Sequence, residues 1–409
     1  MKILYTGTLD VNAGGPAFST YHTMKGLNAI GVQTELLSYE LGASGKLIGM
    51  DVPIHFAKRP CEPIFGYSPT YKRSIRDCGD FDIYQAQGIW QYNTYALVDV
   101  ARKLHKPYVI TPRGMLYPQA INFSKPWFKK MSLKLRLLCD LNHAACVHVT
   151  CEDEMNYCRD LGVISPIAVI PNPVKVELHP AKTDSIFRLG YLGRVSKRKN
   201  IESLIYAWDT LKNKTENAEL IIIGGGDEQY LQFLKDECVR LHLTNVMFTG
   251  FIAGQEKEKV LSGISVLAMP SEFENFGNVI VEGLVRGIPC IATKGAPWKD
   301  LEDFHCGWWV EYSQKAITDA VSKALSCSAE ILAEMGERGK QLMKDKYSIE
   351  AVAKDMKNMY DWILKKAEKP AFIHFFNSNR GGVIWNNQYV ENECFECRFI
   401  GLDEERRVA

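Results

Sequence analysis

Two glutamates eight residues apart mark residues 271–284, SEFENFGNVIVEGL, as a candidate binding segment. The segment follows a predicted strand and opens a predicted helix of about residues 277–286, so Glu274 lies in the loop and Glu282 lies inside the helix. The first amides of a helix lack intrahelical partners and carry partial positive charge, which suits a diphosphate. Carboxylates beside such a site can accept hydrogen bonds from sugar hydroxyls, although two acids that merely cap a helix are the alternative interpretation. The amides concerned belong to Phe276, Gly277, Asn278 and Val279.

A cluster of basic residues follows the first predicted strand of the second half, in residues 190–200, GYLGRVSKRKN. Gly193 and Arg194 come directly after the strand, and Lys199 precedes the next predicted helix. A departing nucleoside diphosphate gains negative charge, and Arg and Lys are the side chains that stabilise such charge. We expect Arg194 and Lys199 to do so, whereas the two basic residues between them fit a solvated loop.

Two glycine turns also follow predicted strands. Gly14 and Gly15, after the first strand, would let the backbone approach a phosphate. The turn lacks the GxGxxG spacing and an acidic ribose partner about 20 residues further on, which argues against a nicotinamide dinucleotide site. For residues 224–226, GGG, a tight turn and a ligand contact are equally good interpretations.

Short apolar runs alternate with helical patterns in both halves, which indicates βαβ units and two mostly parallel sheets. We therefore predict the α/β class, with two Rossmann-like doubly wound domains. Ligands bind beyond the carboxyl ends of parallel strands, so two such domains facing each other would enclose a central cleft. The predicted strands are residues 2–6, 32–38, 81–87, 107–111 and 146–150 in the first half, and 187–192, 219–223, 245–249, 265–269 and 290–293 in the second.

The chain divides at a Pro-Asn-Pro sequence, residues 171–173, which interrupts the alternation. We expect an N-terminal domain over residues 1–172, a linker over 173–184 and a C-terminal domain over 185–346. A helix over 347–366 should return to the N-terminal domain. The tail, residues 367–409, contains short β-like runs at residues 372–376 and 395–400 and has no assigned role.

Composition and charge exclude several classes of protein. The net charge of +1 lacks the strong basic footprint of a nucleic-acid-binding protein. Neither a signal peptide nor a transmembrane run is evident, and the scattered cysteines fit a reduced, cytoplasmic protein. Among the cysteines only Cys394 and Cys397 have CxxC spacing, no second pair completes a zinc site, and no histidines show metal-ligand spacing. The acids of Asp80-Phe81-Asp82 precede a strand at its amino end, where solvated acids are common. We therefore expect no metal site and no nucleic-acid partner.

Taken in order, the motifs GGP, IPNPV, GRVSKRKN, IIIGGGDE and SEFENFGNVIVEGLVRGIPCIAT resemble those of retaining GT-B glycosyltransferases of the family-4 type, also called glycosyl transferases group 1. The resemblance covers about residues 1–366 and implies a metal-independent enzyme. It also implies that the N-terminal domain, residues 1–172, is the acceptor-side domain and that the C-terminal domain, residues 185–346, is the nucleotide-sugar-binding domain. It implies that Glu274 contacts the donor sugar, Glu282 the ribose, and Arg194 and Lys199 the diphosphate. The loop of Gly14 and Gly15 would face both donor and acceptor.

The chain departs from this family at two histidines of the first domain. Where many relatives have His-x-His-Gly, this chain reads Gln85-Ala86-Gln87-Gly88, and it has Arg113 where many place a histidine before a glycine. We therefore take Gln87 and Arg113 as candidate acceptor-side residues, and Arg113 as a partner for an anionic acceptor or the donor phosphate.

The sequence thus favours a retaining hexosyltransferase-type enzyme with no cofactor beyond its donor substrate, a UDP-sugar in preference to a GDP-sugar. We expect it to transfer the sugar to a saccharide or lipid-linked acceptor in cell-surface polysaccharide or glycolipid assembly. A sugar-nucleotide epimerase or a phosphorylase on the same fold is one alternative, and a non-catalytic nucleotide-sugar-binding protein is another.

A basic amphipathic segment extends from Phe123 to Leu138. Its apolar residues recur at helical spacing, and it contains no acid. It could lie on the inner face of the membrane as a peripheral contact, or its apolar stripe could pack on the sheet while the lysines are solvated. The basic residues are Lys125, Lys129, Lys130, Lys134 and Arg136, and the apolar stripe is Trp127, Met131, Leu135 and Leu138.

Overall fold

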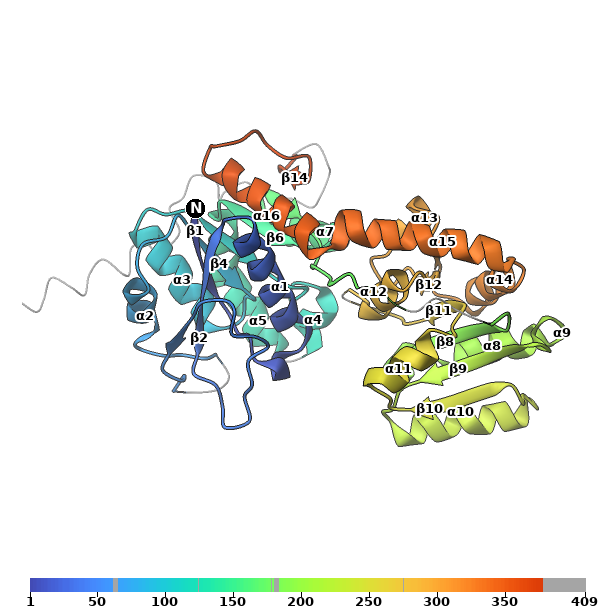
Figure 1. Ribbon diagram of the computed structural model, residues 1–409. Coiled ribbons are helices and arrows are strands. Elements are labelled where there is room, and N and C mark those ends of the chain that lie inside the picture. The colour runs from blue at the N-terminus through green and yellow to red at the C-terminus, as the bar shows by residue number, and fades with distance from the viewer. Residues whose placement is uncertain (62–64, 124, 178, 180–183, 275, 378–409) are drawn as a thin grey trace, which may run out of the picture. The chain divides into compact units, whose positions relative to one another are not determined.

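The computed structural model describes residues 1–61, 65–123, 125–177, 179, 184–274 and 276–377, and it separates the chain into two compact units (Figure 1). The first unit is Met1–Pro173 together with the chain from Val352 onward, and the second is Val174–Ala351. Each unit is built on a mainly parallel sheet covered by helices. The predicted class, two Rossmann-like α/β domains, is confirmed.

The sheet of the first unit has the order β14-β7-β6-β5-β4-β1-β2-β3, and every pairing is parallel except that of β14 with β7. The strand order reverses between β1 and β4, which is where doubly wound sheets bind ligands. The strands are β1 (Lys2–Thr6), β2 (Gln33–Tyr39), β3 (Ile54–Ala57), β4 (Ile83–Gln87), β5 (Tyr108–Thr111), β6 (Cys146–Val149), β7 (Ile167–Val169) and β14 (Ile373–His374).

Helices cover both faces of this sheet, because successive strand residues are apolar and point to opposite faces. Leu4 of β1 packs in one core with α2, α3 and α7, while Ile3 and Tyr5 pack in the other with α1 and α16. The helices are α1 (Gly15–Ala29), α2 (Tyr71–Asp77), α3 (Tyr92–Lys103), α4 (Pro118–Phe123), α5 (Pro126–Ser132), a π-helical turn (Leu133–Leu137), α6 (Leu138–Asn142), α7 (Glu152–Asp160) and α16 (Ile349–Ile363).

The second unit repeats the architecture with the order β10-β9-β8-β11-β12-β13, all parallel, and its strand order reverses between β8 and β11. The strands are β8 (Phe187–Leu192), β9 (Ala218–Ile223), β10 (Val246–Gly250), β11 (Val266–Met269), β12 (Cys290–Thr293) and β13 (Gly307–Val310). The helices are α8 (Glu202–Thr210), α9 (Lys212–Thr215), α10 (Glu228–Arg240), α11 (Gly254–Leu261), α12 (Asn278–Val285), α13 (Asp300–Asp303), α14 (Gln314–Leu325), α15 (Ala329–Leu342) and a π-helical turn (Met343–Tyr347).

Side-chain caps explain where several of these helices begin. Asp227 caps α10 by accepting a hydrogen bond from the Tyr230 amide at 3.0 Å, and Ser313 and Ser328 cap α14 and α15 in the same way. The long helical pattern of residues 329–366 is broken at Ser348, whose extended backbone separates the π-helical turn from α16.

Three strands were not predicted: β3, β7 and β13. They are three or four residues long and lie toward the edges of the sheets, so their sequences carry little periodicity. The β-like run predicted at residues 372–376 contains β14. The structure describes the tail only as far as residue 377, shortly after β14. The predicted β-like run at residues 395–400 and the Cys394–Cys397 pair lie outside the described residues.

Candidate active site

The switch point of the second sheet brings the two most informative sequence segments together. The loop after β8 and the loop after β11 leave the sheet on neighbouring strands. Lys199, from the first loop, forms an ion pair with Glu274, from the second, and less than a fifth of either side chain is exposed. The Asn200 side chain donates to the Pro270 carbonyl at 3.2 Å, which fixes one loop against the other. A cation and a carboxylate thus lie side by side where a ligand is expected.

Arg194 presents a second cation in the same loop. It follows Gly193, whose φ of +146° suits a glycine, and the phenol of the buried Tyr191 donates to the Arg194 carbonyl at 2.9 Å. The Arg194 side chain is exposed and forms no ion pair with any carboxylate of the described residues. Lys197 and Arg198 are also exposed, as expected for a solvated loop.

The first turn of α12 faces the same strand ends. Gly277 caps the helix with φ of +77°, a left-handed conformation that favours glycine, and its carbonyl accepts the Ile280 amide at 2.9 Å. The amides of Asn278 and Val279 precede that first intrahelical bond, so they have no partner within the helix. Phe276 is held by its carbonyl, which accepts a hydrogen bond from the Trp298 indole. This geometry can receive an anion.

Glu282 lies one turn further along α12 and has a partner that sequence reasoning missed. Lys257, on α11, forms an ion pair with the Glu282 carboxylate, and 25% and 32% of the two side chains are exposed. Lys257 carried no recognisable motif, because only the packing of α11 beside α12 brings it near. The predicted role of Glu282 toward a ribose stays a prediction.

Two of the three glycines at residues 224–226 allow the backbone to pack closely against the loop after β8. A side chain on Gly224 would collide with the Gly193 carbonyl, and one on Gly226 with the Val195 carbonyl. The loop after β9 thereby supports the loop that carries Arg194 and Lys199. Of the two interpretations, the tight turn is the one that these contacts bear out.

The switch point of the first sheet gathers the other candidate residues. Gly14, with φ of +68°, precedes α1, and a side chain added there would meet no other atom within 4 Å. Gly15 is exposed in the first turn of α1, so the loop is open to a ligand. Gln87 ends β4, the strand beside β1.

Arg113 joins these elements. Its guanidinium donates to the Gln87 side chain at 2.9 Å, to Ser19 of α1 at 2.7 Å and to Asn172 of the Pro-Asn-Pro segment. Its backbone φ of +57° is unusual for a residue with a side chain. Burial, the largest effect, lowers the pKa of Arg113 to about 10, although the Glu154 carboxylate raises it. No carboxylate of the described residues forms an ion pair with this desolvated cation, which therefore suits an incoming anion.

Gln85, by contrast, is a structural residue. It is fully buried and joins a chain of hydrogen bonds in which the Tyr360 phenol of α16 donates to its carbonyl oxygen at 2.5 Å and its amide donates to Thr111 at 2.9 Å. Thr111 contacts His148 at 3.3 Å, and His148 reaches the Ile170 carbonyl at 2.9 Å. This polar chain lies under α16, and its members gave no sequence signal beyond the Gln-x-Gln-Gly departure.

The two aspartates of Asp80-Phe81-Asp82, which were not expected to bind a metal, form contacts within the fold. Asp80 pairs with Lys106 at 3.0 Å, and Asp82 accepts the Lys2 amide at 2.8 Å, at the amino end of the sheet. Within the described residues, no group of three or more histidines, cysteines or acids is arranged to hold a metal ion. No helix of the described chain is long and apolar enough to cross a membrane.

The chain is similar to known glycosyltransferases in sequence. The chain is 26% identical to the capsular polysaccharide biosynthesis glycosyltransferase CapM of Staphylococcus aureus over 202 residues, which cover 48% of this chain and 51% of CapM. It is 24% identical to the alpha-1,3/1,6-mannosyltransferase alg2 of Schizosaccharomyces pombe over 227 residues, covering 48% and 45%. The chain thus spans about half the length of these curated relatives.

The fold has close counterparts among solved structures. Anabaena HepE in complex with UDP superposes with a TM-score of 0.67 at 18% identity, covering 87% of this chain and 98% of that one, which shows the fold. The model described as Glycosyltransferase Family 4 matches residues 13–178, and that described as Glycosyl transferases group 1 matches residues 179–342. The chain belongs to the group 1 glycosyltransferases, with the two Rossmann-like domains of the GT-B fold.

Proposed function

We propose that the chain is a retaining, metal-independent hexosyltransferase that moves a sugar from a nucleotide-sugar donor to a saccharide or lipid-linked acceptor. The observation that carries this proposal is the ion pair of Lys199 and Glu274 at the switch point, next to the first turn of α12. It supplies a cation for the diphosphate and a carboxylate for sugar hydroxyls within one contact distance.

The donor binds to the second unit in this proposal. Its diphosphate meets Arg194, Lys199 and the amides at the start of α12, while Glu274 accepts hydrogen bonds from the sugar and Glu282 from the ribose. Lys199 exchanges its carboxylate partner for a phosphate oxygen, which leaves Glu274 available to the sugar. Arg113, Gln87 and the loop of Gly14 and Gly15 serve the acceptor side, with Arg113 meeting an anionic group.

Retention follows from a front-face displacement. The bond between the anomeric carbon and the diphosphate oxygen breaks, and the acceptor oxygen bonds to the same face of that carbon. The departing diphosphate oxygen takes the acceptor's proton, and the two cations stabilise its charge. A double displacement as in retaining glycosidases needs a carboxylate nucleophile at the anomeric carbon, whereas in this proposal Glu274 and Glu282 are assigned to hydroxyls of the sugar and the ribose.

The comparisons guide the choice of substrates. HepE was solved with UDP, which supports testing UDP-sugars first, and the alg2 relative is named a mannosyltransferase, so mannose donors with both bases belong in the screen. The name of CapM, a capsular polysaccharide biosynthesis glycosyltransferase, supports a place in cell-surface polysaccharide assembly. Glycolipid assembly is the other place in this proposal, and the reaction is proposed to occur in the cytoplasm, at the inner face of the membrane.

The test is a screen of UDP- and GDP-sugars for binding and for slow donor hydrolysis, followed by transfer to saccharide and lipid-linked acceptors. NMR of the glycosidic linkage gives the anomeric configuration, which we expect to match that of the donor. An inverted product would refute retention. Epimerised donor, or consumption of phosphate without a glycosylated acceptor, would favour the alternative enzymes, and binding without any turnover would favour a binding protein.

A further inference from the structure

The helical segment 126–142, formed by α5, the π-helical turn and α6, has two different faces. Leu133, Leu137 and Leu141 are buried in the core of the first unit. Trp127 and Leu135, however, are 75% and 60% exposed. The interpretation in which the whole apolar stripe packs on the sheet is therefore wrong for these two residues, and the outer face of the segment is left apolar.

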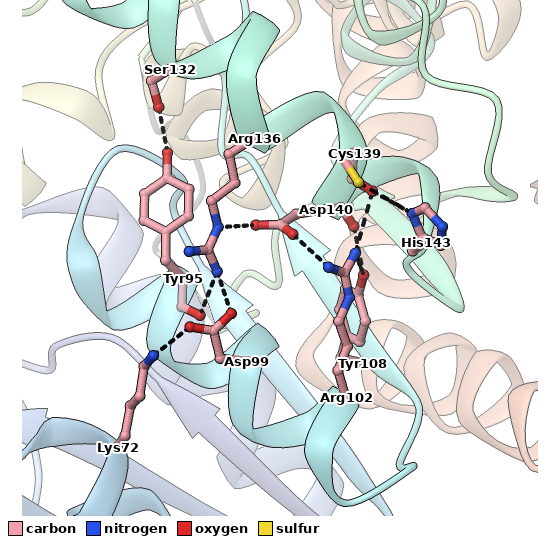
Figure 2. A network of polar contacts seen from close by, with 10 residues as sticks. All are labelled: Lys72, Tyr95, Asp99, Arg102, Tyr108, Ser132, Arg136, Cys139, Asp140 and His143. Atoms are coloured by element: carbon pink, nitrogen blue, oxygen red, sulfur yellow. Dashed lines mark hydrogen bonds and ion pairs between the residues drawn. The ribbon is translucent and has the colours of Figure 1, made fainter. Parts of the chain in front are cut away.

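The inner face is fixed by a polar network (Figure 2). Arg136 forms ion pairs with Asp99 of α3 and with Asp140, the latter at 3.1 Å, and Arg102 of α3 reaches Asp140 at 3.2 Å. Ser132 hydrogen-bonds the Tyr95 phenol at 2.8 Å. Burial, the largest effect, raises the pKa of Asp140, although the two guanidiniums lower it. The network holds the helix against α3, so its outer face is presented without any folding step.

The five basic residues of the segment differ in whether they are engaged by the protein or exposed. Arg136 is turned inward, and Lys129 donates to the Ala120 carbonyl at 2.7 Å while its ammonium lies over the Trp90 ring. Lys125, Lys130 and Lys134 are the exposed cations.

The outer face combines these three cations with aromatic side chains. Phe123, at the end of α4, is 90% exposed, and Phe128 is 38% exposed. A hollow of about 330 Å³ is lined by Lys125, Pro126, Trp127 and Phe128. The sequence contains no acid between Asp99 and Asp140, and both of these aspartates pair with Arg136.

We propose that this outer face docks on an anionic phospholipid surface. Trp127, Phe128 and Leu135 enter the boundary between headgroups and acyl chains, and the lysines meet headgroup phosphates. Lysine is depleted at protein–protein interfaces, whereas exposed aromatics beside lysines are typical of helices that lie in a membrane surface. The inference stands on this surface alone and does not depend on the proposed activity.

The test uses flotation of the full chain with lipid vesicles. We expect binding to vesicles of phosphatidylglycerol and phosphatidylcholine to exceed binding to phosphatidylcholine alone by roughly tenfold or more, and to weaken as salt rises from 0.1 to about 0.5 M. Equal partition to the two lipid compositions, or no flotation with either, would overturn the proposal.

Two double variants identify the face. Trp127→Ser with Leu135→Ser, and Lys125→Gln with Lys130→Gln, should each lower partition to anionic vesicles by roughly tenfold or more. Donor hydrolysis in solution should not change, since none of these residues is placed at the donor site. Vesicle binding that survives in both double variants would refute the assignment.

Matched controls come from the second unit. Phe251 is 83% exposed, and the Lys299 and Lys315 side chains are 65% and 89% exposed. Phe251→Ser removes one strongly exposed apolar side chain elsewhere, and Lys299→Gln with Lys315→Gln removes the same charge as the lysine double variant. Both controls should leave vesicle binding within about twofold of the unaltered protein. If the controls lose as much binding as the target variants, the effect is one of bulk charge or stability and the docking face is wrong.

Discussion

The Lys199 ammonium and the Glu274 carboxylate form an ion pair between two loops whose residues are 75 positions apart in the sequence. In the unliganded protein each charge therefore compensates the other. A diphosphate can compete for Lys199 because it offers more than one charged oxygen, and the carboxylate that it displaces is then free to accept hydrogen bonds. The ion pair thus balances the two charges in the unliganded protein. In the proposed function, the two side chains meet different parts of one donor.

Arg194→Ala and Lys199→Ala should each lower turnover by about 10²-fold or more at saturating donor, because each removes a charge aimed at the leaving group. The measurement is kcat together with the melting temperature. Arg198→Ala is the matched control: its side chain is exposed in the same loop, and its backbone carbonyl, which the substitution keeps, accepts the Glu272 amide at 3.3 Å. Near-normal turnover in the first two variants, or an equal loss in the control, would contradict the assignment.

Transfer should not depend on a divalent metal. The proposed anion site consists of two cations and helix amides, which neutralise a diphosphate without a metal ion. Activity after treatment with a chelator, and after adding back Mg²⁺ or Mn²⁺, is the measurement. Loss of transfer with EDTA that either metal restores would show that the diphosphate is held in another way.

The architecture was predictable because the buried parallel strands are continuous apolar runs, and each is followed by a helix. Residues 2–6, 187–192 and 290–293 were predicted with the bounds of β1, β8 and β12. The helical segment 125–141 was predicted as one helix, whereas it contains a π-helical turn at Leu133–Leu137. The residues Leu133–Leu137 include neither glycine nor proline that would mark an irregular turn, so the sequence does not reveal it.

For the site, the sequence located the loops but not the contacts between them. Arg194, Lys199 and Glu274 follow strands at a switch point, a position that patterns of strands and helices indicate. Lys257 was missed because its pairing with Glu282 depends on how α11 packs beside α12. The environment of Arg113 was missed as well, since Ser19, Gln87 and Asn172 come from three distant segments.

His148 should make the first unit less stable in mild acid. Burial, followed by the Arg113 charge, lowers the pKa of His148 to about 3 from 6.5. Below pH 6.5 the unfolded chain takes up a proton that the native chain does not, so stability present above pH 6.5 is lost as the pH falls toward 3. Between pH 7 and pH 5 the loss from this one residue is about 2 kcal/mol.

The variant His148→Gln isolates this effect, because glutamine can still donate to the Ile170 carbonyl and does not titrate. Denaturant unfolding of both proteins at pH 7 and pH 5 is the measurement. We expect the variant to be less stable at pH 7 but to lose about 2 kcal/mol less on acidification. An equal loss in both proteins would mean that His148 is not buried in its neutral form.

Glu274→Gln and Glu282→Gln should impair different kinetic properties of the enzyme. Glu274→Gln should lower kcat strongly, because the carboxylate is placed at the sugar, where charge develops in the transition state. Glu282→Gln should mainly raise the donor KM and weaken binding of the free nucleoside diphosphate, since ribose is remote from the bond that breaks. The measurements are nucleotide affinity, kcat and melting temperature.

The ion pairs supply the matched controls for this comparison. Lys257→Gln removes the partner of Glu282 and leaves its carboxylate in place, so it should affect donor binding less than Glu282→Gln does. If only the ion pair matters, Lys257→Gln and Glu282→Gln should lower the melting temperature by similar, small amounts. A pair this exposed contributes only up to about 1 kcal/mol to stability. If Glu282→Gln binds the nucleoside diphosphate as tightly as the unaltered protein, the ribose role is wrong. If Glu274→Gln keeps its kcat, the sugar pocket assigned to Lys199 and Glu274 is wrong, and Glu274 is then an acid that only stabilises the fold around α12.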